Sequence, residues 1–168
     1  LTSATLAVNG NLSYYNKRTG FCNGENLILD SPFDYNSQVT LYLARKMPQP
    51  NEAAYNAAAS EQIRRFVDMT CGRAFVLFTS YSMLKKCAED LQEFCRDEGY
   101  TLLVHGEAMS RTAMLNEFKK SNSGIIFGAT SFWTGVDVPG EALSNVIITK
   151  LPFAVPSHPL IEARCDAI

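Results

Sequence analysis

The sequence predicts an α/β fold in three layers, with a mostly parallel central sheet and helices on both of its faces. Apolar runs without alternation, such as Ala74–Phe78, are typical of strands that are buried on both faces. Amphipathic helical stretches separate these runs, and strand–helix–strand alternation at this spacing produces parallel strands. The chain has 168 residues, of which 46% are hydrophobic and 19% charged, so it can bury a substantial core as one domain.

The first part of the chain is predicted to hold short elements. A turn at residues 9–11 leads into a short helix through residues 14–15. The apolar run 26–30 and the β-branched and aromatic run 39–44 each favour a strand. Residues Glu52–Thr70 are predicted to be a helix, because their apolar residues recur at the helical period.

The middle of the chain predicts a strand followed by a long helix. The strand Ala74–Phe78 leads into hydroxyl residues at 79–82, which favour a helix N-cap. The next helix has one apolar stripe from Leu84 to Cys95, with lysines and acidic residues on its solvent side, and it ends at Gly99.

The same strand–helix unit then repeats. A turn at His105–Gly106 precedes a helix that Ser110 caps, and a last helix begins near residues 157–159. Three further strands are predicted, at Thr101–Val104, Gly124–Phe127 and Asn145–Thr149. We expect these three and Ala74–Phe78 to lie side by side in one sheet.

Composition excludes several classes of protein. The net charge of −2 rules out a strongly basic nucleic-acid module. Neither Gly-rich phosphate-loop motif occurs, so the chain by itself has no cradle for a triphosphate. No run approaches the ~20 apolar residues of a membrane span. The five cysteines form no C-x-x-C pair, which favours reduced core cysteines of a cytoplasmic protein and predicts no metal site.

Polar segments follow the predicted strands. In a parallel α/β sheet, ligands bind beyond the carboxyl ends of the strands. The segments at that position are Thr79–Tyr81, His105–Gly106 and Thr130–Asp137, and the polar opening Thr2–Thr5 stands apart from them. We expect His105 to have a structural role.

The run from Ala129 to Gly140, which reads ATSFWTGVDVPG, is the most informative stretch. Thr130 offers a hydroxyl to a phosphate at the end of a buried strand, and Gly135 lets the backbone approach a ligand closely. Asp137 is an anion between two valines, which requires a partner such as an arginine or a ribose hydroxyl. The alternative is an ordinary turn in which Asp137 bonds nearby backbone N–H groups.

This run, together with VIITKLPF at 146–153 and PSHP at 156–159, resembles motif V and its continuation in the DinG/XPD-like superfamily 2 DNA helicases. The opening LTSATL at 1–6 resembles motif III of that family, and FTSY at 78–81 resembles motif IV. The motifs occur in the family's order over nearly the whole chain.

The resemblance implies the second RecA-like motor domain of an ATP-dependent DNA helicase that uses ATP and Mg²⁺, translocates on single-stranded DNA and acts in DNA repair. The partners implied are single-stranded DNA and the first RecA-like domain of the same polypeptide, with no membrane partner. An iron–sulfur cluster, where relatives have one, belongs to the first domain and not to this chain. The chain alone is expected to be inactive as an ATPase, because its half of the site lacks the phosphate loop.

The resemblance also assigns roles to individual residues. Gly135 and Asp137 would face the nucleotide, and Ser3, Ala4 and Thr5 would couple the nucleotide state to domain movement. Single-stranded DNA would be bound by the polar and aromatic residues after two strands, namely Thr79, Ser80, Tyr81, Thr130, Ser131 and Trp133. Trp133 is also suited to core packing.

Two departures from the family pattern leave alternatives open. Thr134 stands where bacterial relatives usually have Glu, and the arginine-rich motif VI is not in this sequence. The Thr134 departure and the lack of a phosphate loop are compatible with a catalytically dead RecA-like binding module. An RNA helicase domain of the same superfamily is the other rival interpretation, and the Phe-Trp and Leu-Pro-Phe signatures argue against it. Both ends of the sequence suggest a fragment. We expect a motif III remnant with a linker helix at 1–20 and the second RecA-like domain, truncated at its C-terminus, at 21–168.

Overall fold

The computed structural model describes residues 2–3, 5–153 and 159–166. The chain divides into two compact units, Leu1–Leu43 and Ala44–Ile168. The predicted boundary after residue 20 separates a motif III remnant from the RecA-like domain, whereas these units are separated by their contacts. The predicted boundary therefore stays a prediction.

The first unit consists of turns and two short helices. A turn closes between Val8 and Asn11, as predicted, and α1 (Ser13–Thr19) follows it. The helix α2 (Tyr35–Gln38) begins after Asp34, whose side chain accepts the amide hydrogen of Asn36.

Neither strand predicted in the amino-terminal part of the chain forms. Residues 26–30 and 39–44 run without helix or strand, and Leu27 and Leu41 are each more than three-quarters exposed. These runs have a strand-like composition but no neighbouring strand to pair with. A strand is stabilised by cross-strand partners, so composition alone did not produce one.

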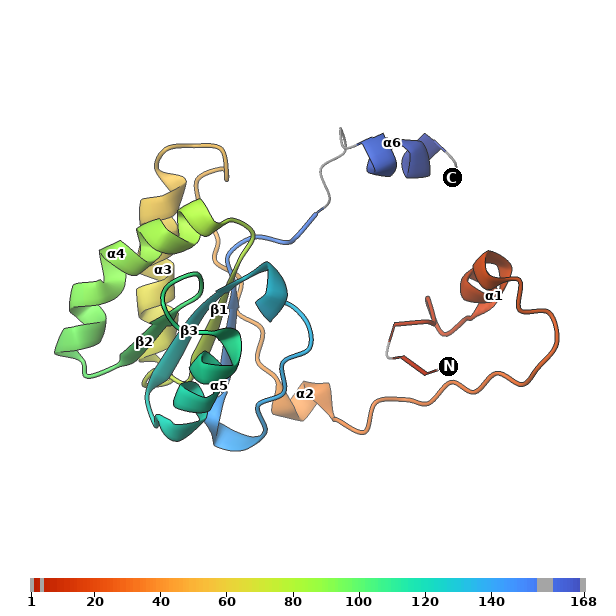
Figure 1. Cartoon of the computed structure of the whole chain (residues 1–168), viewed down its shortest axis with the longest axis horizontal. Coiled ribbons are helices and arrows are strands. Elements are labelled where there is room, and N and C mark those ends of the chain that lie inside the picture. Colours follow the sequence, from red (N-terminus) through yellow and green to blue (C-terminus); the bar gives the residue numbers. More distant parts are fainter. Residues whose placement is uncertain (1, 4, 154–158, 167–168) are drawn as a thin grey trace. The chain divides into compact units, whose positions relative to one another are not determined.

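The second unit is built on a four-stranded sheet in which every pairing is parallel (Figure 1). Its strands are β1 (Ala74–Phe78), β2 (Thr101–Val104), β3 (Gly124–Ala129) and β4 (Asn145–Ile148), in the order β2-β3-β1-β4. The predicted sheet is therefore confirmed, with β3 longer and β4 shorter than expected.

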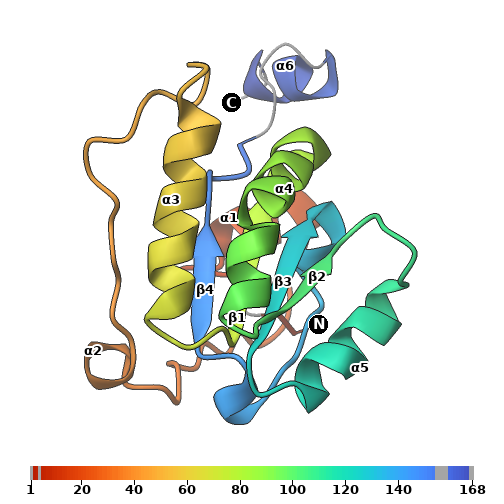
Figure 2. The same cartoon turned by 90° about the vertical axis from the view of Figure 1, so that its left-hand side faces the viewer.

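Helices cover the two faces of the sheet (Figure 2). Both α3 (Tyr55–Asp68) and α4 (Tyr81–Asp97) pack on one face, and α5 (Arg111–Lys120) packs on the other against β2 and β3. A further helix, α6 (Pro159–Asp166), follows in the chain. This arrangement confirms the predicted α/β fold with helices on both faces.

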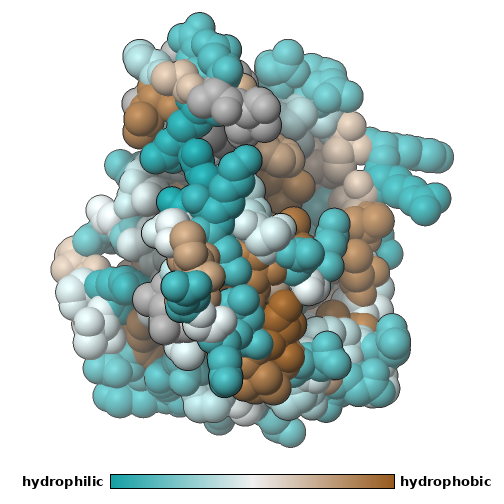
Figure 3. All heavy atoms as spheres, turned by 90° about the vertical axis from the view of Figure 1, so that its right-hand side faces the viewer, coloured by the Kyte–Doolittle hydropathy of each residue, from teal (hydrophilic) through white to brown (hydrophobic). Residues whose placement is uncertain are grey.

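The burial of β4 differs from the prediction. The strands β1 and β3 are buried along their whole length, whereas β4 alternates between half-buried and exposed residues. Since β4 is an edge strand and α5 lies over β2 and β3, the side chains of Val146 and Ile148 remain about half exposed. The space-filling view in Figure 3 shows hydrophobic side chains at the surface among hydrophilic ones.

The loop after β3 covers the part of the second face that α5 leaves open. Phe132 is buried there against Phe75 of β1, with ring centroids 6.4 Å apart. Gly128 makes this approach possible, because a Cβ at that position would lie 2.5 Å from the Cβ of Phe132. The same loop that carries the predicted site residues is thus also part of the core.

Candidate functional site

Four polar segments meet at the carboxyl edge of the sheet because the strands are parallel. Thr79 follows β1, His105 follows β2 and Thr130 follows β3 directly, and Lys150 follows β4 after one residue. Two of these segments carry predicted DNA-binding residues, which the fold thus brings to the same edge.

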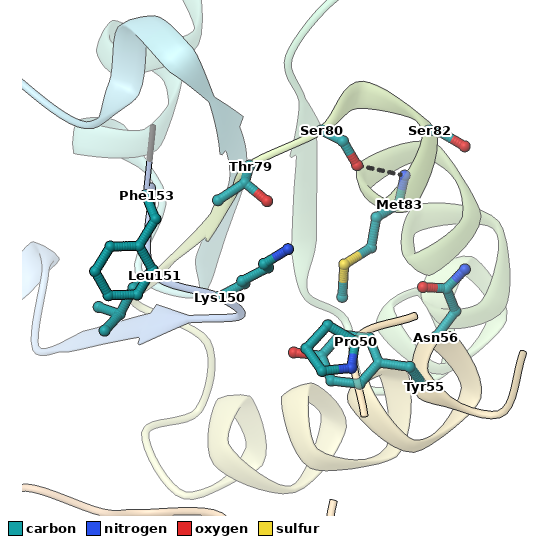
Figure 4. Close-up of a pocket in the computed structure, with 10 residues that line it drawn as sticks. All are labelled: Pro50, Tyr55, Asn56, Thr79, Ser80, Ser82, Met83, Lys150, Leu151 and Phe153. Carbon is teal, nitrogen blue, oxygen red and sulfur yellow. Dashed lines mark hydrogen bonds between the residues drawn. The ribbon is translucent and has the colours of Figure 1, made fainter. Parts of the chain in front are cut away.

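A polar cavity of about 410 Å³ lies at this edge, between α3, the start of α4 and the chain after β4 (Figure 4). Lys150 extends into the space between Thr79 and Met83. Among the described residues, no acidic side chain lines the cavity and no ion pair involves Lys150. The lining residues are Pro50, Tyr55, Asn56, Thr79, Ser80, Ser82, Met83, Lys150, Leu151 and Phe153.

Ser80 has a structural task and a remaining donor in this cavity. It is the N-cap of α4, and its Oγ accepts the amide hydrogen of Met83 at 3.3 Å. A hydroxyl that accepts one hydrogen bond still has its own hydrogen to donate. Ser80 can therefore cap the helix and bind an anion at the same time.

An apolar cavity of about 320 Å³ adjoins the polar one. Trp133 forms part of its wall, and the indole N–H donates to the carbonyl of Phe78 at 2.9 Å. This hydrogen bond fixes the ring at the end of β1. The lining residues are Phe78, Thr79, Thr130, Trp133, Pro152 and Phe153, so the two cavities share Thr79 and Phe153.

Thr130 holds a strained backbone conformation where the loop leaves β3. Its φ is +42°, in the left-handed region that a β-branched residue rarely adopts. Such strain costs about 1–3 kcal/mol and gathers at functional sites. The exposed hydroxyl residues Thr130 and Ser131 begin the short 3₁₀ turn Thr130–Phe132.

Arg111 holds the loop from the first turn of α5. One guanidinium nitrogen donates to the carbonyls of Thr134 and Gly135, each at 2.9 Å, and the guanidinium lies over the ring of Phe132 at 5.5 Å. Because Thr134 contributes its carbonyl, this contact does not depend on the departure from the usual Glu. Gly135 has φ +66°, which a glycine adopts readily.

Asp137 has no arginine partner among the described residues. Its carboxylate is exposed, and no hydrogen bond or ion pair to it is found among the described residues. Arg111 binds the carbonyls of Thr134 and Gly135 instead. The carboxylate is therefore in contact with solvent, and the alternative of a turn in which Asp137 bonds backbone N–H groups is not found among the described residues.

His105 packs among aromatic residues. Its ring lies 5.3 Å from the ring of Tyr81 and 4.9 Å from that of Phe132, and its Nδ1 accepts the amide hydrogen of Ala129 at 3.4 Å. The Tyr81 hydroxyl lies 3.3 Å from the same nitrogen. These contacts favour the structural role, and they hold Tyr81 at the edge with 43% of its surface exposed.

The predicted coupling residues lie in the first unit. The hydroxyls of Ser3 and Thr5 are 3.2 Å apart, and the amide of Thr5 donates to Ser3 Oγ at 3.3 Å. Ala4 lies outside the described residues.

In the part of the chain that the structure describes, no group of three or more histidine, cysteine, aspartate or glutamate residues is placed to hold a metal ion. Cys87 and Cys95 are buried in the core, as predicted, and burial raises the pKa of the Cys95 thiol to about 11. Cys22, Cys71 and Cys165 are exposed, so the core assignment was wrong for them. Among the described helices, none is both long and apolar enough to cross a bilayer.

Sequence reasoning missed two residues that define the cavities. Lys150 and Phe153 stand just after β4, yet they were considered only as parts of a motif. The rule that selected Thr79 and Thr130, a polar or aromatic residue just beyond a strand, would also have selected Lys150.

Comparison with known proteins shows which family this chain resembles. The model of a family described as the helicase C-terminal domain matches residues 63–168. The chain is 38% identical over 165 residues to the "ATP-dependent DNA helicase YoaA" of Escherichia coli (strain K12), covering 98% of this chain and 25% of that protein.

Two further relatives carry a different name. The "3'-5' exonuclease DinG" of Bacillus subtilis (strain 168) is 32% identical over 173 residues, covering 99% of this chain and 18% of that protein. The "ATP-dependent DNA helicase DinG" of Photobacterium profundum is 31% identical over 174 residues, covering 100% of this chain and 25% of that protein. The chain spans a quarter or less of the length of these curated relatives.

Proposed function

Because the chain belongs to the helicase C-terminal domain family, we propose that it is the second RecA-like motor domain of an ATP-dependent DNA helicase. In this role it binds single-stranded DNA at the carboxyl edge of its sheet and completes an ATP site that it shares with a first motor domain. The names of its relatives, which include ATP-dependent DNA helicases, support this assignment.

The observation that carries the proposal is the polar cavity at the carboxyl edge. It combines the Lys150 ammonium group with the hydroxyls of Thr79, Ser80 and Ser82, and no acidic side chain is among its described lining residues. Hydroxyls, ammonium groups and helix N-termini are the groups that contact phosphates independently of sequence. A motor that moves along any strand needs contacts of this kind.

The loop after β3 supports a second contact, toward ATP. Asp137 presents an exposed carboxylate without a partner among the described residues, and the exposed Gly135, whose carbonyl Arg111 holds, lies two residues before it. A carboxylate of this kind accepts hydrogen bonds from ribose hydroxyls or from water on Mg²⁺. ATP with Mg²⁺ would supply phosphoryl transfer when bound, and this chain would orient the nucleotide with Asp137. Ser3, Ala4 and Thr5 would link that site to domain movement.

The proposal is tested by Asp137→Ala in the intact protein. We expect single-stranded DNA-stimulated ATP turnover and unwinding to fall about tenfold or more, since a group at the nucleotide is removed. The melting temperature should stay nearly unchanged, because exposed substitutions typically change stability by less than about 0.5 kcal/mol.

Glu141→Ala is the matched control, since Glu141 is an exposed acidic residue four positions along the same loop. It should leave both activities unchanged. Full activity in a folded Asp137→Ala protein would contradict the assigned role, and an intact protein without DNA-stimulated ATPase would contradict the proposed function.

A further inference from the structure

We infer that the two adjoining cavities hold one nucleotide unit of the DNA strand, with its phosphate in the polar cavity and its base in the apolar cavity. The inference rests on the proposed function and goes further, because it assigns Lys150 and Phe153 as DNA-binding residues and divides the site between two chemical tasks.

The polar cavity suits a single phosphate group. Lys150 places a positive charge in a concave space that also receives the hydroxyls of Thr79 and Ser80 (Figure 4). No carboxylate among the described residues pairs with this ammonium group, so its charge is available to attract an anion, and the hydroxyls supply directed hydrogen bonds. The net charge of −2 for the whole chain means that this attraction is local.

The apolar cavity suits a flat ring. Trp133 is fixed by its hydrogen bond to the Phe78 carbonyl, so its ring does not have to be ordered when a ligand binds. Phe153 and Pro152 supply further apolar surface, and the side chain of Phe153 is 80% exposed. Rings of this kind stack on any base, because every base has a π-face.

Because the two cavities adjoin, one ligand can place a phosphate in the polar cavity and a base in the apolar cavity. Thr79 and Phe153 line both cavities, so a ligand that fills both must carry a negative charge directly beside a flat apolar group. A nucleotide unit of a single strand has this arrangement. Duplex DNA does not fit, since its bases are stacked on each other and paired.

The experiment uses the intact protein and two oligonucleotides of equal length, oligothymidylate and its abasic analogue, which carry the same number of phosphates. Affinity is measured by fluorescence anisotropy across a range of salt concentrations. The DNA concentration for half-maximal ATPase stimulation is measured in parallel.

Each variant has its own expected result. Lys150→Gln should weaken the binding of both oligonucleotides. It should also reduce the slope of log affinity against log salt by about 0.7, the value for one phosphate of a single strand. Phe153→Ala should lower the affinity for oligothymidylate about tenfold and leave the affinity for the abasic strand unchanged. Lys85→Gln, on the exposed face of α4, is the control and should change neither.

Both substituted side chains are exposed, so the variants should fold, and circular dichroism checks this. The inference is overturned if DNA stimulates the ATPase but Lys150→Gln keeps the salt slope, or if Phe153→Ala affects both oligonucleotides equally. A protein whose ATPase does not respond to DNA would instead overturn the proposed function.

Discussion

The two faces of the sheet are covered in different ways. On one face, α3 and α4 supply a continuous helical layer, and α4 buries Leu84, Cys87 and Leu91 in a regular stripe. On the other face, α5 covers β2 and β3, and the loop after β3 covers β1 through Phe132. On the first face only the amino-terminal ends of α3 and α4 reach the candidate site, and the buried stripe of α4 serves stability. On the second face, buried core residues also position the loop that carries part of the candidate site.

The largest expected effect separates these two roles. Phe132→Ala and Leu84→Ala each remove a buried side chain, and each should lower the free energy of unfolding by about 3 kcal/mol. Urea denaturation measures this loss. At a temperature where both variants are folded, Phe132→Ala should also reduce DNA affinity in the intact protein, whereas Leu84→Ala should not. Equal DNA affinity in the two variants would contradict the claim that the core residues of the second face also position the candidate site.

A smaller effect is expected from the arginine that holds the loop. Arg111→Ala removes two hydrogen bonds to loop carbonyls and should destabilise the chain by about 1–2 kcal/mol. Hydrogen exchange should rise most around Gly135. Arg64, which lies 5.0 Å over the ring of Phe94 on the other face, provides the matched control. Arg64→Ala should cost about 0.5–1 kcal/mol and leave exchange in the loop unchanged.

Relief of strain should make a change of opposite sign. Thr130→Gly allows φ +42° without a side-chain clash, so we expect a gain of about 1 kcal/mol in the free energy of unfolding. The same variant loses the hydroxyl at the apolar cavity and should bind DNA more weakly. Thr130→Ser keeps the hydroxyl and serves as the comparison. A Thr130→Gly chain that is less stable than the original would contradict the claim that Thr130 is strained.

The smallest effect belongs to the helical face and depends on pH. Hydrogen bonds from Lys86 and Ser60 lower the pKa of Asp90 below its usual value near 4. The folded state therefore gains stability at any pH above that usual value, and loses it as the pH falls through the lowered pKa. Because the pair is exposed and solvent screens it, this contribution should be the smallest of those considered. Asp90→Asn should remove this component from a pH series of urea denaturations.

The sheet could be predicted from the sequence because the composition of its central strands indicates that they are buried. The runs AFVLF and GIIFGA are apolar throughout, and only burial on both faces accommodates such runs. Residues 26–30 and 39–44 have similar composition but remain unpaired, since pairing depends on a neighbour that composition does not specify. The edge position of β4, which leaves Val146 exposed, also follows from topology and not from local sequence.

The candidate site could be predicted only in part. The hydroxyl residues Thr79, Ser80 and Thr130 were found because they follow buried strands. Sequence spacing does not show that Arg111 would bind loop carbonyls and leave Asp137 to solvent, because that choice depends on where α5 begins. The contribution of Phe153 depends on the path of the chain after β4, which no local pattern specifies.

The position of Trp133 has an optical consequence. It is the only tryptophan in the sequence, and it is half-buried in the wall of the apolar cavity with its N–H held by Phe78. The intrinsic emission of this chain, excited at the red edge of protein absorbance, therefore comes from one known place. A ring stacked on the indole would quench that emission, and unfolding would shift it to longer wavelength as water reaches the indole. This chain thus carries a built-in fluorophore that distinguishes occupancy of the cavity from loss of the fold, without any attached dye.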